Sequence, residues 1–175
     1  ALTKAPEIAK LARGIVVMGS TILHPGIHGP VAPMVDANFA NDPEAAHIVL
    51  QAGANVTLVG MDVTMTTLLT DEMRARIVAA GDPAAVTLMR ITEFYVNSYK
   101  TMYPGIRGCG LHDPLAVAVA EDPSLVKKER MCVDIELAGT LTRGMTVADR
   151  RRTAAGRENA HVCLGVAGER FSQRL

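Results

Sequence analysis

A chain of 175 residues with 49% hydrophobic residues is long enough to form one domain with a substantial buried core. Eighteen basic and eighteen acidic residues give a formal net charge of zero, which argues against partners such as nucleic acid or an anionic membrane surface. No apolar run approaches the roughly 20 residues of a transmembrane helix. The three cysteines are far apart and lack metal-ligand spacing, so we expect a reducing, cytoplasmic location.

The chain begins with a predicted helix, a predicted strand and a long loop. Residues 6–13 favour a short helix, with Ile8 and Leu11 facing the interior, and the apolar residues 15–18 favour a buried strand. Residues 19–41 follow without helical or strand periodicity, and a loop of this length is usually functional or disordered. Its mixed apolar content argues against disorder, so we expect a functional loop.

A helix and a second apolar strand come next. Asp42 starts the helix, Gly53 ends it, and residues 55–61 form the strand. The helix residues expected to face the interior are Ala45, Ile48, Val49 and Ala52. Continuously apolar strands that alternate with helices indicate a parallel sheet covered on both faces. Ligands of such sheets bind beyond the carboxyl ends of the strands, that is, beyond Met18 and Met61.

Two further helices occupy the middle of the chain. Thr70 is expected to cap a helix over 71–80, and a longer helix runs from Asp82 to about Met102. Three tyrosines recur every four residues near the end of the longer helix and share one face, namely Tyr95, Tyr99 and Tyr103. A core or interface stripe is the usual explanation, but the polar segment that follows leaves a ligand-facing role open.

Two adjacent titratable residues, His112 and Asp113, lie between a glycine-rich turn at 108–110 and an apolar helix at 115–120. An aspartate in this position can bind a metal ion, and a histidine can move a proton. Asp followed by Pro is also a common helix start, in which the carboxylate only caps backbone amides. The spacing alone favours the capping role for Asp113.

The last third of the chain predicts an antiparallel hairpin, one more strand and a helix. Residues 131–137 and 141–147 alternate around Ala-Gly-Thr, residues 161–166 are apolar, and residues 169–175 can begin a helix. Together these elements predict an α/β fold with a mostly parallel sheet flanked by helices and an antiparallel hairpin. No linker or repeat divides the chain, so we expect residues 1–175 to form a single domain.

Several segments carry a resemblance to a known family. The two longest are 36–46, Asp-Ala-Asn-Phe-Ala-Asn-Asp-Pro-Glu-Ala-Ala, and 111–118, Leu-His-Asp-Pro-Leu-Ala-Val-Ala. Supporting segments are 16–19, 61–64 and 141–147. In order and separation they resemble the nucleoside hydrolase family, the inosine-uridine preferring nucleoside N-ribohydrolases. The resemblance implies a nucleoside hydrolase-like (Rossmann-like) fold, of which this chain would be the incomplete, C-terminal part.

The resemblance also implies a calcium-dependent reaction, in which the N-glycosidic bond of a ribonucleoside is hydrolysed to ribose and free base. By the family pattern, Asp113 would be a ligand of Ca²⁺, and His112 would stand near the departing base as a proton donor. The residues expected to bind the nucleoside are Met18, Asp36, Asn38, Tyr99 and Tyr103. Oxygen-bearing side chains around the sugar suit an oxocarbenium-like transition state. Members of the family commonly form dimers and tetramers, so a homo-oligomer is expected.

Three departures from the family pattern concern the sugar side of the site. Asp36 replaces the usual Glu with a shorter side chain, so its ribose contact would need a water molecule or a shifted loop. Pro30 replaces an Asn, and one sugar contact is lost because proline offers neither an amide side chain nor an N–H. The segment 19–29 is longer than usual, and its His24 and His28 could supply substitute contacts, although surface positions are more common for such histidines.

The aspartate cluster that supplies most of the metal ligands in this family, Asp-x-Asp-x-x-x-Asp-Asp, does not occur in the 175 residues. Asp113 alone cannot complete a site that takes about six to eight oxygen ligands. We therefore expect this chain to be the C-terminal half of the enzyme and to be inactive by itself. The alternative is a non-catalytic relative that acts as a binding or assembly module, which the changes at Asp36 and Pro30 favour.

Overall fold

The computed structural model describes residues 1–23, 35–151 and 156–175. The strands are β1 (Ile15–Met18), β2 (Val56–Val59), β3 (Leu68–Thr70), β4 (Gly108–Gly110), β5 (Val126–Ile135), β6 (Thr146–Asp149) and β7 (Ala160–Val166). The helices are α1 (Ile8–Leu11), α2 (Ala37–Asn41), α3 (Pro43–Gln51), α4 (Met61–Thr64), α5 (Asp71–Ala79), α6 (Pro83–Met102), α7 (His112–Glu121) and α8 (Gly168–Ser172), with a 3-10 turn η1 (Pro123–Leu125).

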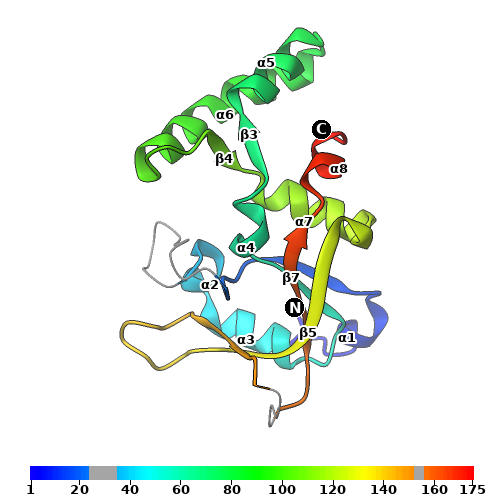
Figure 1. The fold of residues 1–175 in the computed structure, drawn as a ribbon. Coiled ribbons are helices and arrows are strands. Elements are labelled where there is room, and N and C mark those ends of the chain that lie inside the picture. Colours follow the sequence, from blue (N-terminus) through cyan, green and yellow to red (C-terminus); the bar gives the residue numbers. More distant parts are fainter. Residues whose placement is uncertain (24–34, 152–155) are drawn as a thin grey trace.

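Five strands form one sheet in the order β1-β2-β7-β5-β6 (Figure 1). Strands β1, β2 and β7 are parallel, and Leu58 of β2 lies between Val17 and Val162. Strand β5 runs antiparallel to both of its neighbours, β7 and β6. The predicted α/β class, with a mostly parallel sheet and an antiparallel hairpin at one edge, is therefore confirmed.

Helices cover both faces of this sheet. On one face, Leu50 of α3 and Phe39 of α2 pack against strand residues such as Leu58. On the other face, α7 and α8 contribute Leu115 and Phe171. Leu58 and Leu115 are at most 1% exposed, and burying each such side chain stabilises the fold by about 1.5–3 kcal/mol.

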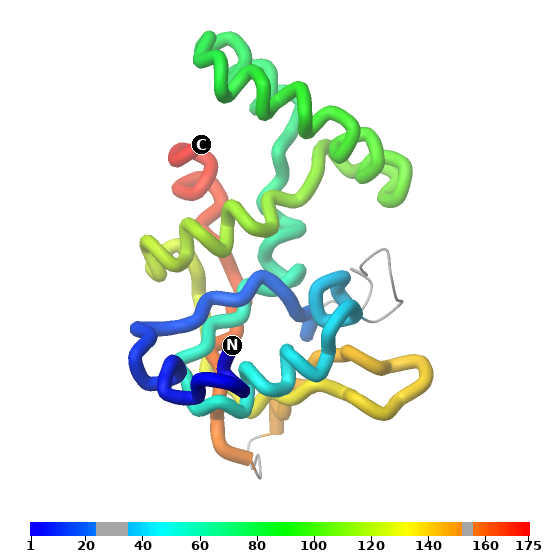
Figure 2. Tube along the Cα trace, turned by 180° about the vertical axis from the view of Figure 1, so that it is seen from behind, coloured from blue at the N-terminus to red at the C-terminus, as the bar shows by residue number. Residues whose placement is uncertain are grey.

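A second lobe stands apart from the five-stranded sheet. Strands β3 and β4 pair antiparallel at its base, and α5 and α6 extend from them, as the two opposite views show (Figures 1 and 2). Its core includes Leu69, Val96, Tyr99 and Cys109. The pair was not predicted, because residues 108–110 were interpreted as a turn. Gly108 belongs to strand β4 instead, and its Cα lies so close to the Leu69 carbonyl that a side chain would overlap it.

Two predicted helix faces are wrong. Helix α1 is a single turn in which Ala9 is the buried residue, so Ile8 is 38% and Leu11 79% exposed. In α3 the inward stripe is Pro43, Ala46, Val49 and Leu50, while Ala45 and Ile48 face outward and Ala52 follows the end of the helix. The observed inward face is shifted by one residue from the predicted one, which is about 100° around the helix. Val49 belongs to both faces, so its apolar side chain did not distinguish them.

The hairpin is present, but its strands have other bounds than predicted. Strand β5 begins at Val126, whereas β6 contains only Thr146–Asp149. The connection between them turns at Gly144, which has a φ of 87°, and begins with the Glu136 carboxylate accepting hydrogen bonds from the amides of Ala138 and Gly139. Leu141 lies on this connection and is 79% exposed, so this apolar residue does not belong to a strand.

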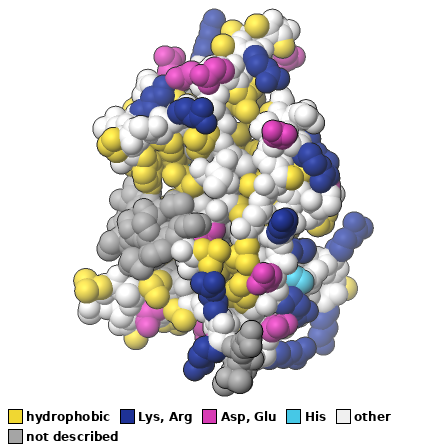
Figure 3. All heavy atoms as spheres, in the orientation of Figure 1, with side chains coloured by type: hydrophobic (Ala, Val, Ile, Leu, Met, Phe, Trp, Pro, Cys, Tyr) yellow, Lys and Arg dark blue, Asp and Glu magenta, His cyan; other side chains and the backbone are white. Residues whose placement is uncertain are grey.

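Among the exposed apolar side chains of the described residues, several lie on the second lobe, where Figure 3 shows apolar side chains. On α6 they are Leu88, Ile91, Phe94, Tyr95 and Met102. Among the described helices, none has both the length and the apolar composition that crossing a bilayer requires.

Candidate active site

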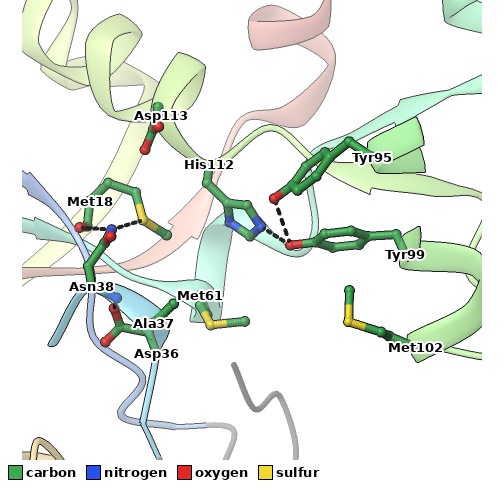
Figure 4. Close-up of a pocket in the computed structure, with 10 residues that line it drawn as sticks. All are labelled: Met18, Asp36, Ala37, Asn38, Met61, Tyr95, Tyr99, Met102, His112 and Asp113. Carbon is green, nitrogen blue, oxygen red and sulfur yellow. Dashed lines mark hydrogen bonds between the residues drawn. The ribbon is translucent and has the colours of Figure 1, made fainter. Parts of the chain in front are cut away.

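A cavity of about 320 Å³ opens where the five-stranded sheet meets the second lobe (Figure 4). It lies at the carboxyl ends of β1 and β2, the position predicted for a ligand. The residues that line it are Met18, Asp36, Ala37, Asn38, Met61, Tyr95, Tyr99, Met102, His112 and Asp113. The structure thus brings together every predicted site residue except Tyr103, whose ring lies behind, 5.5 Å from the ring of Tyr99.

Four lining residues were not among the predicted site residues. Tyr95 shares the tyrosine face of α6, and that spacing was the signal for it. Met61 follows the carboxyl end of β2, and this position was the signal for it. Ala37 and Met102 carry no sequence signal, because their place depends on how α2 and α6 approach each other across the cavity.

Asn38 is fixed against the end of β1. Its Nδ2 donates a hydrogen bond to the carbonyl oxygen of Met18 at 3.0 Å and lies 3.2 Å from the Met18 sulfur. The amide group is therefore held at the wall of the cavity, and Met18 lies beside it, as a shared sugar-binding surface would require.

Asp36 is 2% exposed and caps α2. Its Oδ1 accepts hydrogen bonds from the amides of Asn38 (3.0 Å) and Phe39 (3.2 Å), and its Oδ2 accepts one from the amide of Ser20 (2.8 Å). Burial raises the pKa of Asp36, and these hydrogen bonds only partly offset it. Both oxygens already bind backbone amides, so a sugar hydroxyl would compete with the cap.

A second buried carboxylate, Asp62, holds the chain that leaves β1. Its two oxygens accept hydrogen bonds from the amides of Ile22 and Leu23, each at 2.8 Å. Ser20, between these contacts and β1, has a φ of 85°, which is rare for a residue with a side chain. Asp36 and Asp62 therefore fix the start of the predicted functional loop beside the cavity.

His112 is hydrogen-bonded at both ring nitrogens. Its Nε2 lies 2.5 Å from the hydroxyl of Tyr99, and its Nδ1 lies 2.7 Å from Oγ1 of Thr64. Tyr95 donates to the Tyr99 hydroxyl at 3.3 Å, so the three aromatic residues form a connected chain (Figure 4). Burial lowers the pKa of His112, which the nearby charge of Asp113 partly counteracts. Burial raises the pKa of Tyr99, which keeps its proton.

Asp113 lies in the first turn of α7 with an exposed side chain. The residue at the N-cap is Leu111, and the cap lacks a side-chain hydrogen bond. Within the described parts of the chain, no hydrogen bond or ion pair engages the Asp113 carboxylate. The capping role is therefore not supported, and the carboxylate is available at the cavity.

The described residues supply only part of the ligand set that the predicted Ca²⁺ site needs. In the described ranges no group of three or more His, Cys, Asp or Glu side chains comes together as a metal site. Asp113 alone offers one carboxylate, where Ca²⁺ takes about six to eight oxygens. These residues do not form a calcium site by themselves. Three residues singled out in the sequence, His24, His28 and Pro30, lie outside the described residues.

Fold and site together define an α/β protein with a ligand cavity beyond its parallel strands, lined by a histidine, an asparagine and two aspartates. Its sequence matches the model of a family described as inosine-uridine preferring nucleoside hydrolase over residues 1–173. The chain therefore belongs to this family.

Relatives and solved structures agree with this assignment. The chain is 40% identical over 147 residues to an inosine-uridine preferring nucleoside hydrolase of Leishmania major, covering 83% of the chain and 45% of that protein. It is 34% identical over 175 residues to the pyrimidine-specific ribonucleoside hydrolase RihA of Salmonella newport (strain SL254), covering 99% of the chain and 55% of that protein. The structure of a purine-preferring ribonucleoside hydrolase from Gardnerella vaginalis superposes with a TM-score of 0.86 at 40% identity, covering 99% of this chain and 54% of that one.

The chain thus spans about half the length of the relatives that it matches, from 45% to 55%. The three relatives also differ in the nucleosides that their names specify, which are inosine and uridine, pyrimidine ribonucleosides, and purine ribonucleosides.

Proposed function

We propose that the whole protein to which this chain belongs hydrolyses the N-glycosidic bond of ribonucleosides, releasing ribose and the free base. The observation that carries the proposal is the cavity itself, in which Asn38 of α2 meets His112 and Asp113 of α7. Its volume of about 320 Å³ lies in the range of small-molecule sites. Membership of the nucleoside hydrolase family supports the reaction class.

The two sides of the cavity suggest how a nucleoside would lie. One side is polar, with Asn38 and Asp113, and suits the ribose hydroxyls. The other side is aromatic and apolar, with Tyr95, Tyr99 and Met102, and suits a planar base. In this orientation Met18 packs near the sugar, and Asp36 acts chiefly by holding Asn38 in place.

His112 is the proposed source of the proton for the departing base. The bond between the anomeric carbon and the base nitrogen breaks with its electron pair on the base, and a water molecule supplies the hydroxyl to the sugar. In its protonated form, His112 would pass the Nε2 proton to the oxygen of Tyr99 while the Tyr99 proton moves on toward the base, which leaves a neutral ring with its proton on Nδ1. Tyr103 would support this chain from behind through its contact with the Tyr99 ring.

Asp113 is the proposed contribution of this chain to a Ca²⁺ site. Its support is an exposed carboxylate at the cavity that has no partner among the described residues. Bound Ca²⁺ would offer a hard centre for oxygen ligands, including the ribose hydroxyls. The remaining ligands would come from residues outside those described. We propose accordingly that the 175-residue chain alone is inactive.

The decisive experiment is release of nitrophenolate from nitrophenyl riboside, together with hydrolysis of inosine and uridine, by the whole protein with added Ca²⁺ and with a chelator. Calcium-dependent turnover is the expected result, and the ratio of the two nucleosides gives the base preference. Binding of a nucleoside without any turnover would overturn the proposal in favour of a binding module, which the three backbone contacts of Asp36 would suit.

We further propose that the protein is a homo-oligomer of the cytoplasm. Its three cysteines are unpaired, as in a reducing compartment. Among the described strands β1 is paired on one side only, and exposed apolar side chains on α6 offer a further contact surface. Sedimentation velocity of the whole protein measures its mass in solution, and a monomer at micromolar concentration would contradict the oligomer.

A further inference from the structure

His112 has a partner that the proposed reaction does not use. Thr64 is the last residue of α4 and is 0% exposed, and its Oγ1 lies 2.7 Å from Nδ1 of His112. The imidazole is therefore held from two sides, by Thr64 at Nδ1 and by Tyr99 at Nε2. Because the two contacts lie on opposite edges of the ring, they fix its plane as well as its position.

The directions of the two hydrogen bonds to the ring depend on which ring nitrogen carries the proton. Tyr95 donates to the oxygen of Tyr99, so the proton of Tyr99 is free to point at Nε2 of His112. A neutral imidazole whose Nε2 accepts a hydrogen bond carries its proton on Nδ1. In that tautomer the proton points at Thr64, whose Oγ1 lies 2.7 Å from Nδ1 and can accept it.

Thr64 is itself held rigidly. Its amide donates to the carbonyl oxygen of Gly60 at 3.1 Å, and its own carbonyl accepts from the amide and the hydroxyl of Thr67 at 3.2 and 2.9 Å. Gly110 packs on the opposite side, where a side-chain carbon would lie 2.5 Å from Nε2 of His112. The ring thus lies between Gly110 and the rigidly held Thr64, which is the partner of Nδ1.

We propose that Thr64 is a positioning residue for His112, which keeps the imidazole proton on Nδ1 and turns Nε2 toward Tyr99 and the cavity. This inference rests on the proposed proton-donating role of His112, and it adds the residue that determines which nitrogen faces the nucleoside. Without the Thr64 hydroxyl, the Nδ1–H group would be buried without a partner, which favours the other tautomer or a rotated ring.

Three variants of the whole protein test the proposal. Thr64→Val removes the hydroxyl and keeps the shape, and Thr64→Ser keeps the hydroxyl. The matched control is Thr57→Val, because Thr57 on β2 is also buried and the two ring nitrogens of His112 contact Thr64 and Tyr99 instead. A general packing defect would affect both valine variants, whereas a loss of positioning would affect Thr64→Val and be restored in Thr64→Ser.

The first measurement is the ¹⁵N NMR spectrum of the His112 ring at about pH 8.5, where an imidazole is neutral. We expect the proton on Nδ1 in the wild type, in Thr64→Ser and in Thr57→Val, and a mixture or the opposite tautomer in Thr64→Val. An unchanged Nδ1–H signal in Thr64→Val overturns the proposal. This measurement needs no turnover, so it decides the inference even if the protein hydrolyses no nucleoside and the proposed function fails.

The second measurement compares kcat/KM for inosine with kcat/KM for nitrophenyl riboside, whose leaving group departs without a proton. We expect Thr64→Val to lower the inosine-to-nitrophenyl ratio by about tenfold, a part of the roughly 10²–10⁴ that a positioned proton donor contributes. Thr64→Ser should restore the ratio, and Thr57→Val should leave it unchanged. Equal slowing of both substrates by Thr64→Val contradicts a positioning role.

Discussion

Asp36 shows how one residue can combine a structural and a site role. Its carboxylate binds the amides of Ser20, Asn38 and Phe39, so it joins the end of β1 to the start of α2. We expect Asp36→Ala to lower the free energy of unfolding by about 1–2 kcal/mol, the usual loss for a helix cap, as measured by chemical denaturation. Asp36→Asn keeps one oxygen acceptor and should lose less. Equal losses in the two variants would contradict the capping role.

The raised pKa of Asp36 predicts that the stability of the fold depends on pH. Because burial raises the pKa of Asp36 above its ordinary 3.8, the folded state binds a proton more tightly than the unfolded state. This contribution to stability is fully present below pH 3.8 and is lost as the pH rises through the raised pKa. We therefore expect the wild type to lose stability relative to Asp36→Asn over that window. Denaturation curves of both proteins, measured at several pH values, test the sign, and a difference independent of pH would reject it.

Variants of Asp113 distinguish a helix-capping role of this residue from a role as metal ligand. Since its carboxylate caps no amide among the described residues, Asp113→Ser and Asp113→Ala should change the unfolding free energy alike, by about 0.5 kcal/mol or less. Calorimetric titration of the whole protein with Ca²⁺ should show a large loss of affinity in both variants. If Asp113→Ser binds Ca²⁺ and turns over as the wild type does, the metal assignment is wrong.

At the scale of the elements, prediction from sequence succeeded where the chain marks an element by a local signal. Asp82 and Thr70 accept hydrogen bonds from amides of the first turn of α6 and α5, as their residue types indicated. Strands β3 and β4 have three residues each, too few for any periodicity, and their pairing joins residues about forty positions apart. The inward faces of α1 and α3 failed for a similar reason, since apolar spacing on a short helix fits more than one stripe.

For the candidate site too, the sequence predicted some features and not others. The resemblance drew attention to Asn38, His112 and Asp113, and the cavity brings them together. The sequence offered no means to find the contact of Thr64 with His112, because it depends on the packing of α4 against α7. Nor could residue types reveal that both oxygens of Asp36 would bind backbone amides. Such contacts depend on tertiary packing, which local patterns do not encode.

The β3–β4 pair makes a prediction of its own. Because the backbone of Gly108 lies against the Leu69 carbonyl, Gly108→Ala should push the two strands apart and destabilise the fold by about 1–3 kcal/mol. Gly168 is a suitable control, since a side-chain carbon there would meet no atom within 4 Å. Urea denaturation of both variants measures the difference. A Gly108→Ala protein as stable as Gly168→Ala would show that the strands can separate without loss.

At the scale of the whole molecule, the proposed metal site needs ligands from outside the described residues. The only proposed ligand here is Asp113, and the described ranges contain no cluster of three candidate ligands. A ligand that binds only the folded state stabilises it by an amount that grows with the ligand concentration relative to Kd. Calcium should therefore raise the Tm of the whole protein and leave the Tm of the 175-residue chain unchanged.

Thermal melting in millimolar Ca²⁺, in Mg²⁺ and in a chelator measures this difference, with circular dichroism to show that the 175-residue chain is folded at the start. The whole protein should melt several degrees higher in Ca²⁺ than in the chelator, and Asp113→Ser should remove most of that shift. A calcium-dependent rise in the 175-residue chain would mean that these residues complete a site by themselves. The role of Asp113 as one ligand among several from elsewhere in the protein would then be wrong.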